Sequence, residues 1–433
     1  MQLISTHGQS PPATFRQAVM GGLAPDGGLY LPASLPVLEP EEIDSWRGLP
    51  LPDLASRLAL RLLADEFPAD VIARLTADAF DVPAPTVAVE GNRFVLELFH
   101  GPTLAFKDFG ARFLARFVGY LLGVTDRTAT ILVATSGDTG SAVAHGFHLV
   151  ANVRVVLLYP KGRVSAFQEA QMATLAGNVR ALRVPGTFDD CQRLVKRAFA
   201  DEALTALGLS SANSINIGRL LPQSFYYFAS YLAVTQKTGE PVIFSVPSGN
   251  LGNLTGGVLA QRLGLPVARF LAASNRNDVL PEYLATGKYR ARPAIQTLSN
   301  AMDVGDPSNF PRLLALHGGS VDAMRANLAG YAIDETQTRQ TIRDVNARAS
   351  YVLDPHGAVG YAAACAYGKT SGHDLPLVTL ATAHPAKFAT AIADELGFSP
   401  SLPPGHEDWA TRPIVATDLP DAEYDSFRDC LLM

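Results

Sequence analysis

The sequence is poor in cysteine, in charged residues and in long apolar runs, and each shortage excludes a class of protein. Only three cysteines occur in 433 residues, Cys191, Cys365 and Cys430. Their wide separation gives no zinc-ligand spacing, and their odd number fits a reducing compartment better than a disulfide framework. Charged residues make up 18% and hydrophobic residues 48% of the chain, which indicates a globular protein with a large buried core.

The sequence also lacks the marks of a membrane, exported or nucleic-acid-binding protein. No apolar run approaches the length of a membrane span, and the N-terminus MQLISTHGQS has no basic region followed by an apolar one. A net charge of −6 gives no reason to expect nucleic acid or an anionic membrane as partner. We expect a cytoplasmic protein without metal or an obligate protein partner, in which local groups hold any anionic ligand.

The texture of the sequence changes near residue 90. Residues 1 to about 90 are rich in proline and glycine, with one helical stretch over 51–65 and a junction at Pro83-Ala84-Pro85. Beyond Phe94, short β-branched or leucine-rich runs alternate with amphipathic helical patterns. The predicted strands are 129–135, 153–159, 179–184, 242–246, 267–272 and 377–380. This alternation predicts an α/β protein with mostly parallel, helix-covered sheets, in which ligands bind where the strands end.

Lys107 stands at the start of a strongly helical pattern, directly after the apolar Phe106. Phe109, Phe113, Phe117 and Leu121 recur every four residues and so form one face of a helix. The positive helix N-terminus and the apolar neighbour both favour the neutral amine. A neutral lysine amine is what Schiff-base chemistry with a carbonyl compound requires. An arbitrary lysine at a helix start is more often an ordinary surface cation, so the rest of the chain decides.

Three loops that follow predicted strands are candidate anion sites. Small hydroxyl, amide or glycine residues stand where free backbone N–H groups and a helix N-terminus would face a bound group. The loops are 136–141 (SGDTGS), 248–253 (SGNLGN) and 382–387 (TAHPAK). None has the spacing of a Walker A or dinucleotide motif, and each alone reads as a capped turn. Together with Lys107 they fit pyridoxal phosphate with an amino-acid substrate.

The residues that carry this chemistry resemble those of a known family. The matching segments are ISTHGQ, GGLAPDGGLYLPASLP, FHGPTLAFKDFG, ATSGDTGSA, NSINIGRLLPQ, SVPSGNLGN, LDPHGAVG and ATAHPAKF. Across nearly its whole length the chain is similar to threonine synthases, pyridoxal-phosphate enzymes of the tryptophan synthase β-subunit-like fold, fold type II. The resemblance implies two open, helix-covered, mostly parallel sheets plus an N-terminal domain.

The resemblance also implies roles for individual residues. Lys107 would form the internal aldimine, and Thr382 would face the pyridine nitrogen. The residues implied to hold the cofactor phosphate are Gly249, Asn250, Leu251, Gly252 and Asn253. The residues implied to receive the substrate carboxylate are Ser136, Gly137, Asp138 and Thr139. The residues implied to grip the substrate phosphate are Asn213, Ser214 and Arg219; the planar fork of arginine suits phosphate oxygens.

The implied reaction converts O-phospho-L-homoserine and water to L-threonine and phosphate, the last step of threonine biosynthesis. It proceeds by γ-elimination and β-addition of water, with Lys107 as the base at Cα. A neutral Thr382 hydroxyl suits elimination better than transamination. The alternatives within the fold are a phospholyase that makes 2-oxobutyrate and a serine/threonine dehydratase, which has no substrate phosphate to bind. A binding protein on a retired fold is the alternative outside enzymes, and the retained lysine argues against it.

The resemblance sets the expected domains. The N-terminal domain covers 1–90, the large cofactor domain covers 91–119 and 236–433, and a small substrate-closing domain covers 120–235. Residues 402–433 read as an ordinary tail, without an effector-binding module. His384 is expected to order a turn rather than to catalyse, and Asp190 to cap a helix.

Overall fold

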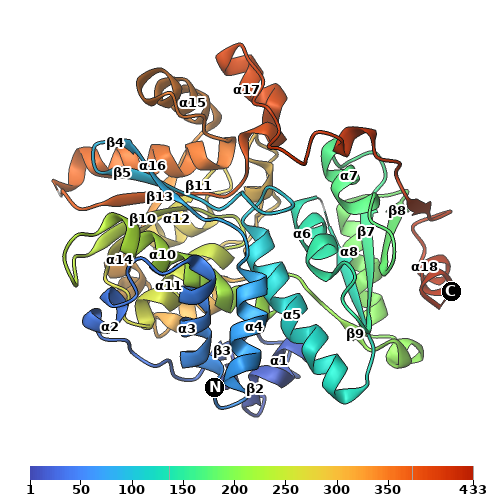
Figure 1. The fold of residues 1–433 in the computed structure, drawn as a ribbon. Helices are drawn as coiled ribbons and strands as arrows, with labels where there is room; N and C mark the ends of the chain where they lie inside the picture. The colour runs from blue at the N-terminus through green and yellow to red at the C-terminus, as the bar shows by residue number, and fades with distance from the viewer. Residues whose placement is uncertain (136, 373, 433) are drawn as a thin grey trace.

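The computed structural model describes residues 1–135, 137–372 and 374–432, and in these it contains three β-sheets. A sheet of six strands and a sheet of five strands stand side by side, joined by helix α5 (Lys107–Thr125), and a small sheet lies at the N-terminal end (Figure 1). Both larger sheets are mostly parallel and covered by helices, so the predicted fold class is confirmed. No helix in these residues is long and apolar enough to cross a membrane.

The six-stranded sheet has the order β12-β11-β10-β13-β5-β4, with only the edge strand β4 antiparallel. Its strands are β4 (Thr86–Glu90), β5 (Arg93–Glu97), β10 (Val242–Pro247), β11 (Val267–Ser274), β12 (Leu328–Ala332) and β13 (Leu377–Ala381). The helices around it are α10 (Phe225–Val234), α11 (Gly252–Arg262), α12 (Val279–Thr286), α13 (Phe310–Leu316), α14 (Val321–Asn327), α15 (Glu335–Ala349), α16 (Pro355–Ser371) and α17 (Ala389–Leu396). The strands β10, β11 and β13 were predicted within two residues at each end.

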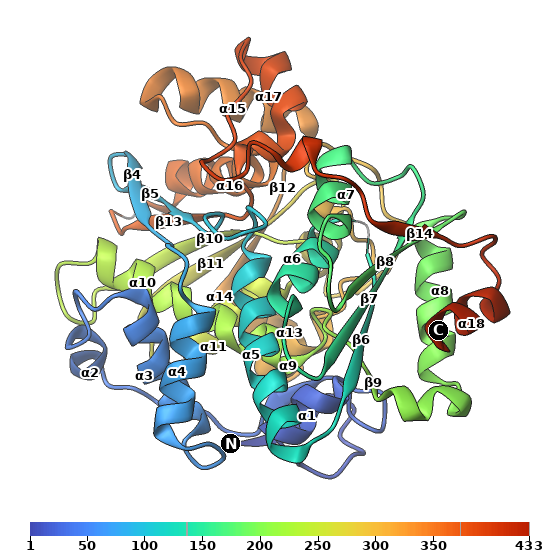
Figure 2. The ribbon, with the colours of Figure 1, turned by 45° about the vertical axis from the view of Figure 1, so that its right-hand side comes forward.

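The five-stranded sheet is entirely parallel, in the order β14-β8-β7-β6-β9. Its strands are β6 (Ala129–Ala134), β7 (Val153–Pro160), β8 (Val179–Val184), β9 (Leu209–Ser210) and β14 (Ala416–Asp418). Its helices are α6 (Asp138–Phe147), α7 (Ala166–Ala173), α8 (Phe188–Phe199) and α18 (Tyr424–Leu432). Figure 2 shows the C-terminal segment crossing to this sheet. The reading of 402–433 as an ordinary tail is therefore wrong: it adds an edge strand and a helix that packs on the same apolar cluster.

The N-terminal residues form an antiparallel sheet and four helices, of which the first and the fourth pack against α5. The sheet has the order β2-β1-β3, built from β1 (Gln2–Ser5), β2 (Ala13–Thr14) and β3 (Tyr30–Pro32). The helices are α1 (Phe15–Gly21), α2 (Pro40–Asp44), α3 (Leu51–Leu63) and α4 (Ala69–Ala79). Among them α3 corresponds to the helix predicted over 51–65.

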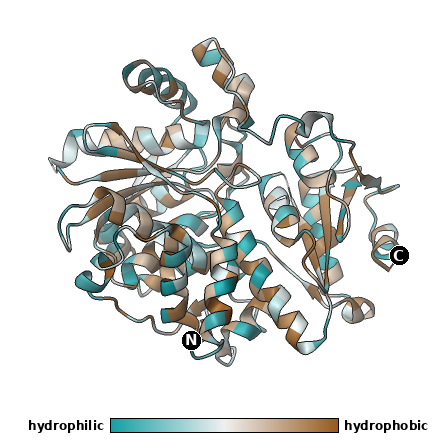
Figure 3. Ribbon diagram, in the orientation of Figure 1, coloured by the Kyte–Doolittle hydropathy of each residue, from teal (hydrophilic) through white to brown (hydrophobic). Residues whose placement is uncertain are grey.

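Helix α5 forms where the four-residue repeat predicts it. Phe109, Phe113, Phe117 and Leu121 are all buried, and Phe113 and Phe117 make edge-to-face contacts with Phe15 of helix α1. The helix ends at Asp126, which adopts the left-handed conformation. In Figure 3 the strands are mostly brown, whereas teal predominates on exposed helices such as α15. The apolar face of α5 thus fixes Lys107, its first residue, between the two larger sheets.

Candidate active site

Lys107 is the first residue of α5, and hydrogen bonds between Asp108 and the preceding segment fix its position. The side chain of the buried Asp108 accepts hydrogen bonds from the Thr103 backbone N–H (2.9 Å) and hydroxyl (2.7 Å), which closes the turn before the helix. Burial raises the pKa of Asp108 to about 6, against the lowering effect of the Thr103 hydrogen bonds. Asp108 therefore shapes the turn that presents Lys107.

The carboxylate of Asp138 lies between two lysines. Its Oδ2 is 3.7 Å from Lys107 Nζ and its Oδ1 is 2.7 Å from Lys387 Nζ. Burial alone would raise the pKa of Asp138, but the charges of Lys387 and Lys107 outweigh it and hold that pKa below its usual range. Asp138 is therefore a fixed anion in contact with the reactive lysine.

The amine of Lys107 is poised toward its neutral form, as the sequence predicts. Burial is the largest cause of its lowered pKa; Asp138 opposes this effect, and the charges of Lys387 and Arg219 add to it. The sequence predicts the helix start and Phe106 as causes, and the structure adds two cations from distant segments. A neutral amine can attack a carbonyl or accept a proton.

The end of β13 is fastened to the segment before Lys107. Phe106 N–H donates to the Thr382 carbonyl (3.0 Å), His384 N–H donates to the Leu104 carbonyl (3.0 Å), and Ala105 pairs with Ala383. Thr382 is buried beside this bridge. The Nδ1 atom of His384 accepts from Ala386 N–H and caps the next turn, so the expected turn-ordering role is confirmed. The loop with Thr382 and the lysine segment are thus one unit.

The loop 249–253 leads into α11 and keeps its backbone donors free. Leu251 adopts φ +61°, a left-handed conformation that is uncommon for leucine, and its carbonyl accepts from Thr255. The Asn253 amide is used inside the protein, by Ser248, Leu254 and the Pro247 carbonyl. In the described part of the chain, the N–H groups of residues 250–253 donate no hydrogen bond. Four free N–H groups at a helix start form an anion site.

The loop from Gly137 to Thr139 starts α6 beside the lysines. Gly137 has φ +145°, a conformation that residues with a side chain rarely adopt, so this position requires glycine. The Nε2 of Gln168 donates to Asp138 Oδ1 (3.1 Å). Ser136, the remaining predicted residue of this loop, lies outside the described residues.

The segment with Asn213, Ser214 and Arg219 approaches α5 from the other side. Arg219 is buried, its Nη1 donates to the Ala212 carbonyl (2.6 Å), and burial lowers its pKa to about 10. Within the described residues, Arg219 Nε and Asn213 Oδ1 have no hydrogen-bond partner. A Cβ on Gly110 would lie 2.6 Å from the Arg219 carbonyl, so a glycine one turn after Lys107 permits this close approach. The buried guanidinium thus keeps a free donor next to the lysine.

The structure adds three side chains for which the sequence analysis assigned no role: Lys387, Asn309 and Arg312. Lys387 falls in the third candidate loop, but nothing in its neighbours predicts a buried amine that also donates to the Thr103 carbonyl (3.1 Å). Asn309 donates to the Asn250 carbonyl, and Arg312 donates to the Ser214 carbonyl and to Asn309. An arginine on an amphipathic helix reads as a surface residue, so only the folded chain identifies it.

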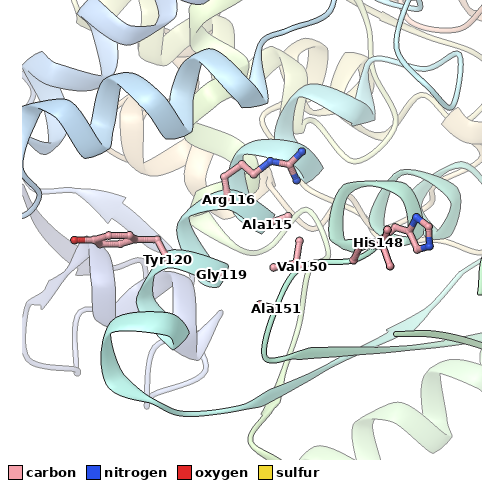
Figure 4. Close-up of a pocket in the computed structure, with 8 residues that line it drawn as sticks. Ala115, Arg116, Gly119, Tyr120, His148, Val150 and Ala151 are labelled. Carbon is pink, nitrogen blue, oxygen red and sulfur yellow. The ribbon is translucent and has the colours of Figure 1, made fainter. Parts of the chain in front are cut away.

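Two pockets on the described surface lie away from these residues. One is formed by Ala115, Arg116, Gly119 and Tyr120 of α5 and by residues 148–151, which face them in Figure 4; another is formed by residues near Asp334. Neither includes a predicted site residue. No cluster of three or more histidine, cysteine, aspartate or glutamate side chains that could hold a metal occurs among the described residues.

The residues brought together fit pyridoxal phosphate. The free N–H groups of loop 250–253 match a phosphate, and the largely buried amine of Lys107, with its lowered pKa, matches an aldehyde. Thr382 at the end of β13 offers a neutral hydroxyl. This donor set contains no group that would repel an anion at the loop.

Three family models match the chain. Pyridoxal-phosphate dependent enzyme matches residues 82–382, threonine synthase N terminus matches residues 2–80, and threonine synthase C-terminal matches residues 357–430. The threonine synthase of Escherichia coli is 42% identical over 433 residues, which cover 100% of this chain and 99% of the relative.

Solved structures agree along the whole length. The structure of pyridoxal-phosphate-bound threonine synthase from Brucella melitensis is similar with a TM-score of 0.95 at 37% identity, covering 100% of this chain and 98% of that one. Threonine synthase from yeast is similar with a TM-score of 0.92 at 31% identity, with the same coverage. The chain belongs to the threonine synthase family of pyridoxal-phosphate-dependent lyases of fold type II.

Proposed function

We propose that this enzyme converts O-phospho-L-homoserine and water to L-threonine and phosphate, the last step of threonine biosynthesis. The observation that carries the proposal is the coupling of two groups in one buried site. Arg219, with an unpaired guanidinium nitrogen, lies close enough to Lys107 for its charge to lower the lysine pKa. An amine base next to a phosphate-binding cation is what a phosphorylated amino acid requires.

We propose that Lys107 carries the cofactor and moves the protons. Pyridoxal phosphate, when bound, supplies the carbonyl that condenses with the substrate amine and a ring that withdraws electrons from Cα. The amine of Lys107, freed by the substrate, takes the proton from Cα and returns protons later in the reaction. Its lowered pKa supports this role, since a lysine in its ammonium form accepts no proton. Thr382 is proposed to face the pyridine nitrogen.

We propose that loop 249–253 holds the cofactor phosphate, chiefly through backbone. The residues assigned are Gly249, Asn250, Leu251, Gly252 and Asn253. The free N–H groups of 250–253 support this assignment. The side chains of Asn250 and Asn253 make hydrogen bonds within the protein that hold the loop in shape. The Asn250 amide oxygen accepts from Ser308, and this contact ties the loop to the start of α13.

We propose that Asn213, Ser214 and Arg219 bind the substrate phosphate, and that Ser136, Gly137, Asp138 and Thr139 form the loop that receives the substrate carboxylate. Unpaired atoms on Arg219 and Asn213 support the phosphate assignment. Turning the Asn213 amide by 180° presents its NH2 group instead, because the two orientations have the same shape. A dehydratase, whose substrate has no phosphate, would leave these groups without a ligand.

The loop proposed to receive the substrate carboxylate carries an anion of its own, Asp138. Its side chain is an anion held by Lys387 and lies 3.7 Å from Lys107. A substrate carboxylate at this loop would therefore be bound by backbone N–H groups, with Lys387 offsetting the charge of Asp138. The proposed domains are an N-terminal domain over 1–90, a cofactor domain over 91–119 and 236–433, and a small domain over 120–235. The small domain contains this loop and would carry it toward the substrate.

The test is product identification from O-phospho-L-homoserine with enzyme reconstituted with pyridoxal phosphate. Threonine with equimolar phosphate supports the proposal, and 2-oxobutyrate with phosphate and ammonia would move the enzyme to the phospholyases. If the enzyme leaves the phosphorylated substrate unreacted but consumes threonine offered in its place, it is a dehydratase.

The three free cysteines support a cytoplasmic location, where thiols stay reduced.

A further inference from the structure

Asn309 is a fully buried amide with one end unused. It stands directly before α13, and its Oδ1 accepts a hydrogen bond from Arg312 Nη1 (2.8 Å). Arginine can only donate, so this contact fixes which end of the amide is oxygen. In the described part of the chain, Asn309 Nδ2 has no hydrogen-bond partner. Burying an amide donor without an acceptor is unfavourable, so the free NH2 group indicates a missing ligand.

The free NH2 group lies at the loop that begins α11. The backbone N–H of Asn309 donates to the Asn250 carbonyl (3.2 Å). A Cβ built on Gly252 would lie 3.6 Å from Asn309 Nδ2, so the amide nitrogen lies next to the backbone of Gly252. The free N–H groups of residues 250–253 occupy the same loop. The side-chain donor and the backbone donors therefore belong to one anion site.

Arg312 holds this amide and is itself a buried cation without a carboxylate. Its Nε donates to the Tyr30 carbonyl (2.9 Å) and its Nη2 to the Ile215 carbonyl (2.6 Å). Its Nη1 donates to the Ser214 carbonyl (3.3 Å) as well as to Asn309. Burial lowers the pKa of Arg312 to about 9. Among the described residues it contacts only neutral oxygens, and a buried cation of this kind is stabilised by a nearby anion.

We propose that Asn309 Nδ2 is a further ligand of the cofactor phosphate and that Arg312 is the positioning residue that orients it. The proposal rests on the proposed role of loop 249–253 as the phosphate cradle. Through Ser214 and Ile215, Arg312 also fixes the segment assigned to the substrate phosphate. The Arg312 guanidinium thus links the two proposed phosphate sites to each other and, through the Tyr30 carbonyl, to the N-terminal sheet.

The test compares the affinity of the apoprotein for pyridoxal phosphate with its affinity for pyridoxal, which has no phosphate. In Asn309→Asp the acceptor for Arg312 remains, but a carboxylate oxygen replaces the NH2 group. The affinity for pyridoxal phosphate is expected to fall about ten- to hundredfold, the loss of a charge-assisted hydrogen bond. The affinity for pyridoxal is expected to stay unchanged. Absorbance titration measures both constants without turnover.

A double-mutant cycle tests the positioning role. Arg312→Met is expected to weaken pyridoxal phosphate binding in the wild-type background and to add nothing in Asn309→Ala, because Arg312 acts through Asn309. Arg312→Lys is expected to restore part of the loss. Thermal unfolding of each variant identifies those that fail to fold, and Asn309→Asp alone then decides the ligand assignment.

Two control variants separate the outcomes. Asn327→Ala removes a half-buried amide that pairs with Gln261, and it is expected to bind both compounds as the wild type does. Asn253→Ala disturbs the cradle and is expected to weaken pyridoxal phosphate binding. If it does so while Asn309→Asp binds normally, the inference is overturned and the cradle stands; if neither variant changes binding, both assignments fail. Equal losses for both compounds, or a loss confined to KM for the phosphorylated substrate, would also overturn the inference.

Discussion

Replacing Gly110 by alanine should weaken substrate binding without replacing any residue assigned to the site. A Cβ at this position would lie 2.6 Å from the Arg219 carbonyl and 3.1 Å from Arg219 Nε. The closer of the two atoms is a backbone oxygen, so the backbone of Arg219 must shift. Overpacking of this kind costs about 1–3 kcal/mol.

The shift acts on the guanidinium proposed to bind the substrate phosphate. Hydrogen bonds to charged groups contribute about 1.5–3 kcal/mol each, so partial loss of one lowers kcat/KM about ten- to hundredfold. The loss should appear as a higher KM for O-phospho-L-homoserine, and the affinity for pyridoxal phosphate should stay near that of the wild type. Steady-state kinetics and cofactor titration measure the two effects separately.

The same helix supplies the control. Gly123 is exposed near the end of α5, and no atom lies within 4 Å of a Cβ built there. Gly123→Ala therefore gains only helix propensity, about 0.5–1 kcal/mol of stability, with unchanged kinetics. A wild-type KM in Gly110→Ala, in a folded protein, would refute the close packing of Arg219 on α5 as the reason for this glycine.

Three further predictions concern the charges and caps of the structure. Lys107→Ala should abolish both turnover and the visible absorbance of covalently bound cofactor; retained activity would exclude Lys107 as the base. Lys387→Met leaves the Asp138 anion uncompensated beside Lys107, so the pKa of the amine freed by the substrate rises and the acid limb of the kcat–pH profile moves to higher pH, whereas Asp138→Asn should move it to lower pH; identical profiles would contradict the contact geometry. Thr187→Ala removes the capping box of α8, far in sequence from the site residues, and should cost about 1 kcal/mol of stability in denaturant unfolding without changing KM.

The parts of the fold that the sequence predicts are those with a strong local signal. The strands β6, β7, β8, β10, β11 and β13 consist of apolar, often β-branched residues followed by turn residues, and all were found. The N-terminal strands β1, β2 and β3 were missed because they span only two to four residues. Strand β14 was missed because Thr417 and Asp418 are exposed and carry no apolar pattern. Its place in the sheet comes from pairing with β8, more than 200 residues earlier.

The same distinction applies to the site. Lys107 and the loop before α11 follow from helix starts, a local feature that a sequence displays. The burial of Lys387 depends on Asp138 and Thr103, which lie 249 and 284 residues away in the chain. Asn309 and Arg312 likewise acquire their roles from Asn250, Ser214 and Tyr30. Contacts of this range leave no spacing that a single sequence could reveal.

The charge balance of the site differs from that of the whole chain, and this difference has a functional reason. The protein carries a net charge of −6, which disfavours a substrate with a phosphate and a carboxylate. Inside, the cations Lys387, Arg219 and Arg312 outnumber the carboxylates of Asp108 and Asp138. Burying such an excess of cations is unfavourable by itself, as the lowered pKa values of both arginines indicate. The phosphates of the cofactor and the substrate would offset this cost when they bind. The unfavourable free energy of burying these cations therefore contributes to the affinity of the site for anions. The attraction then acts at short range inside a buried site, where salt screens charges only weakly. A uniformly basic surface, by contrast, would attract all anions without selecting among them.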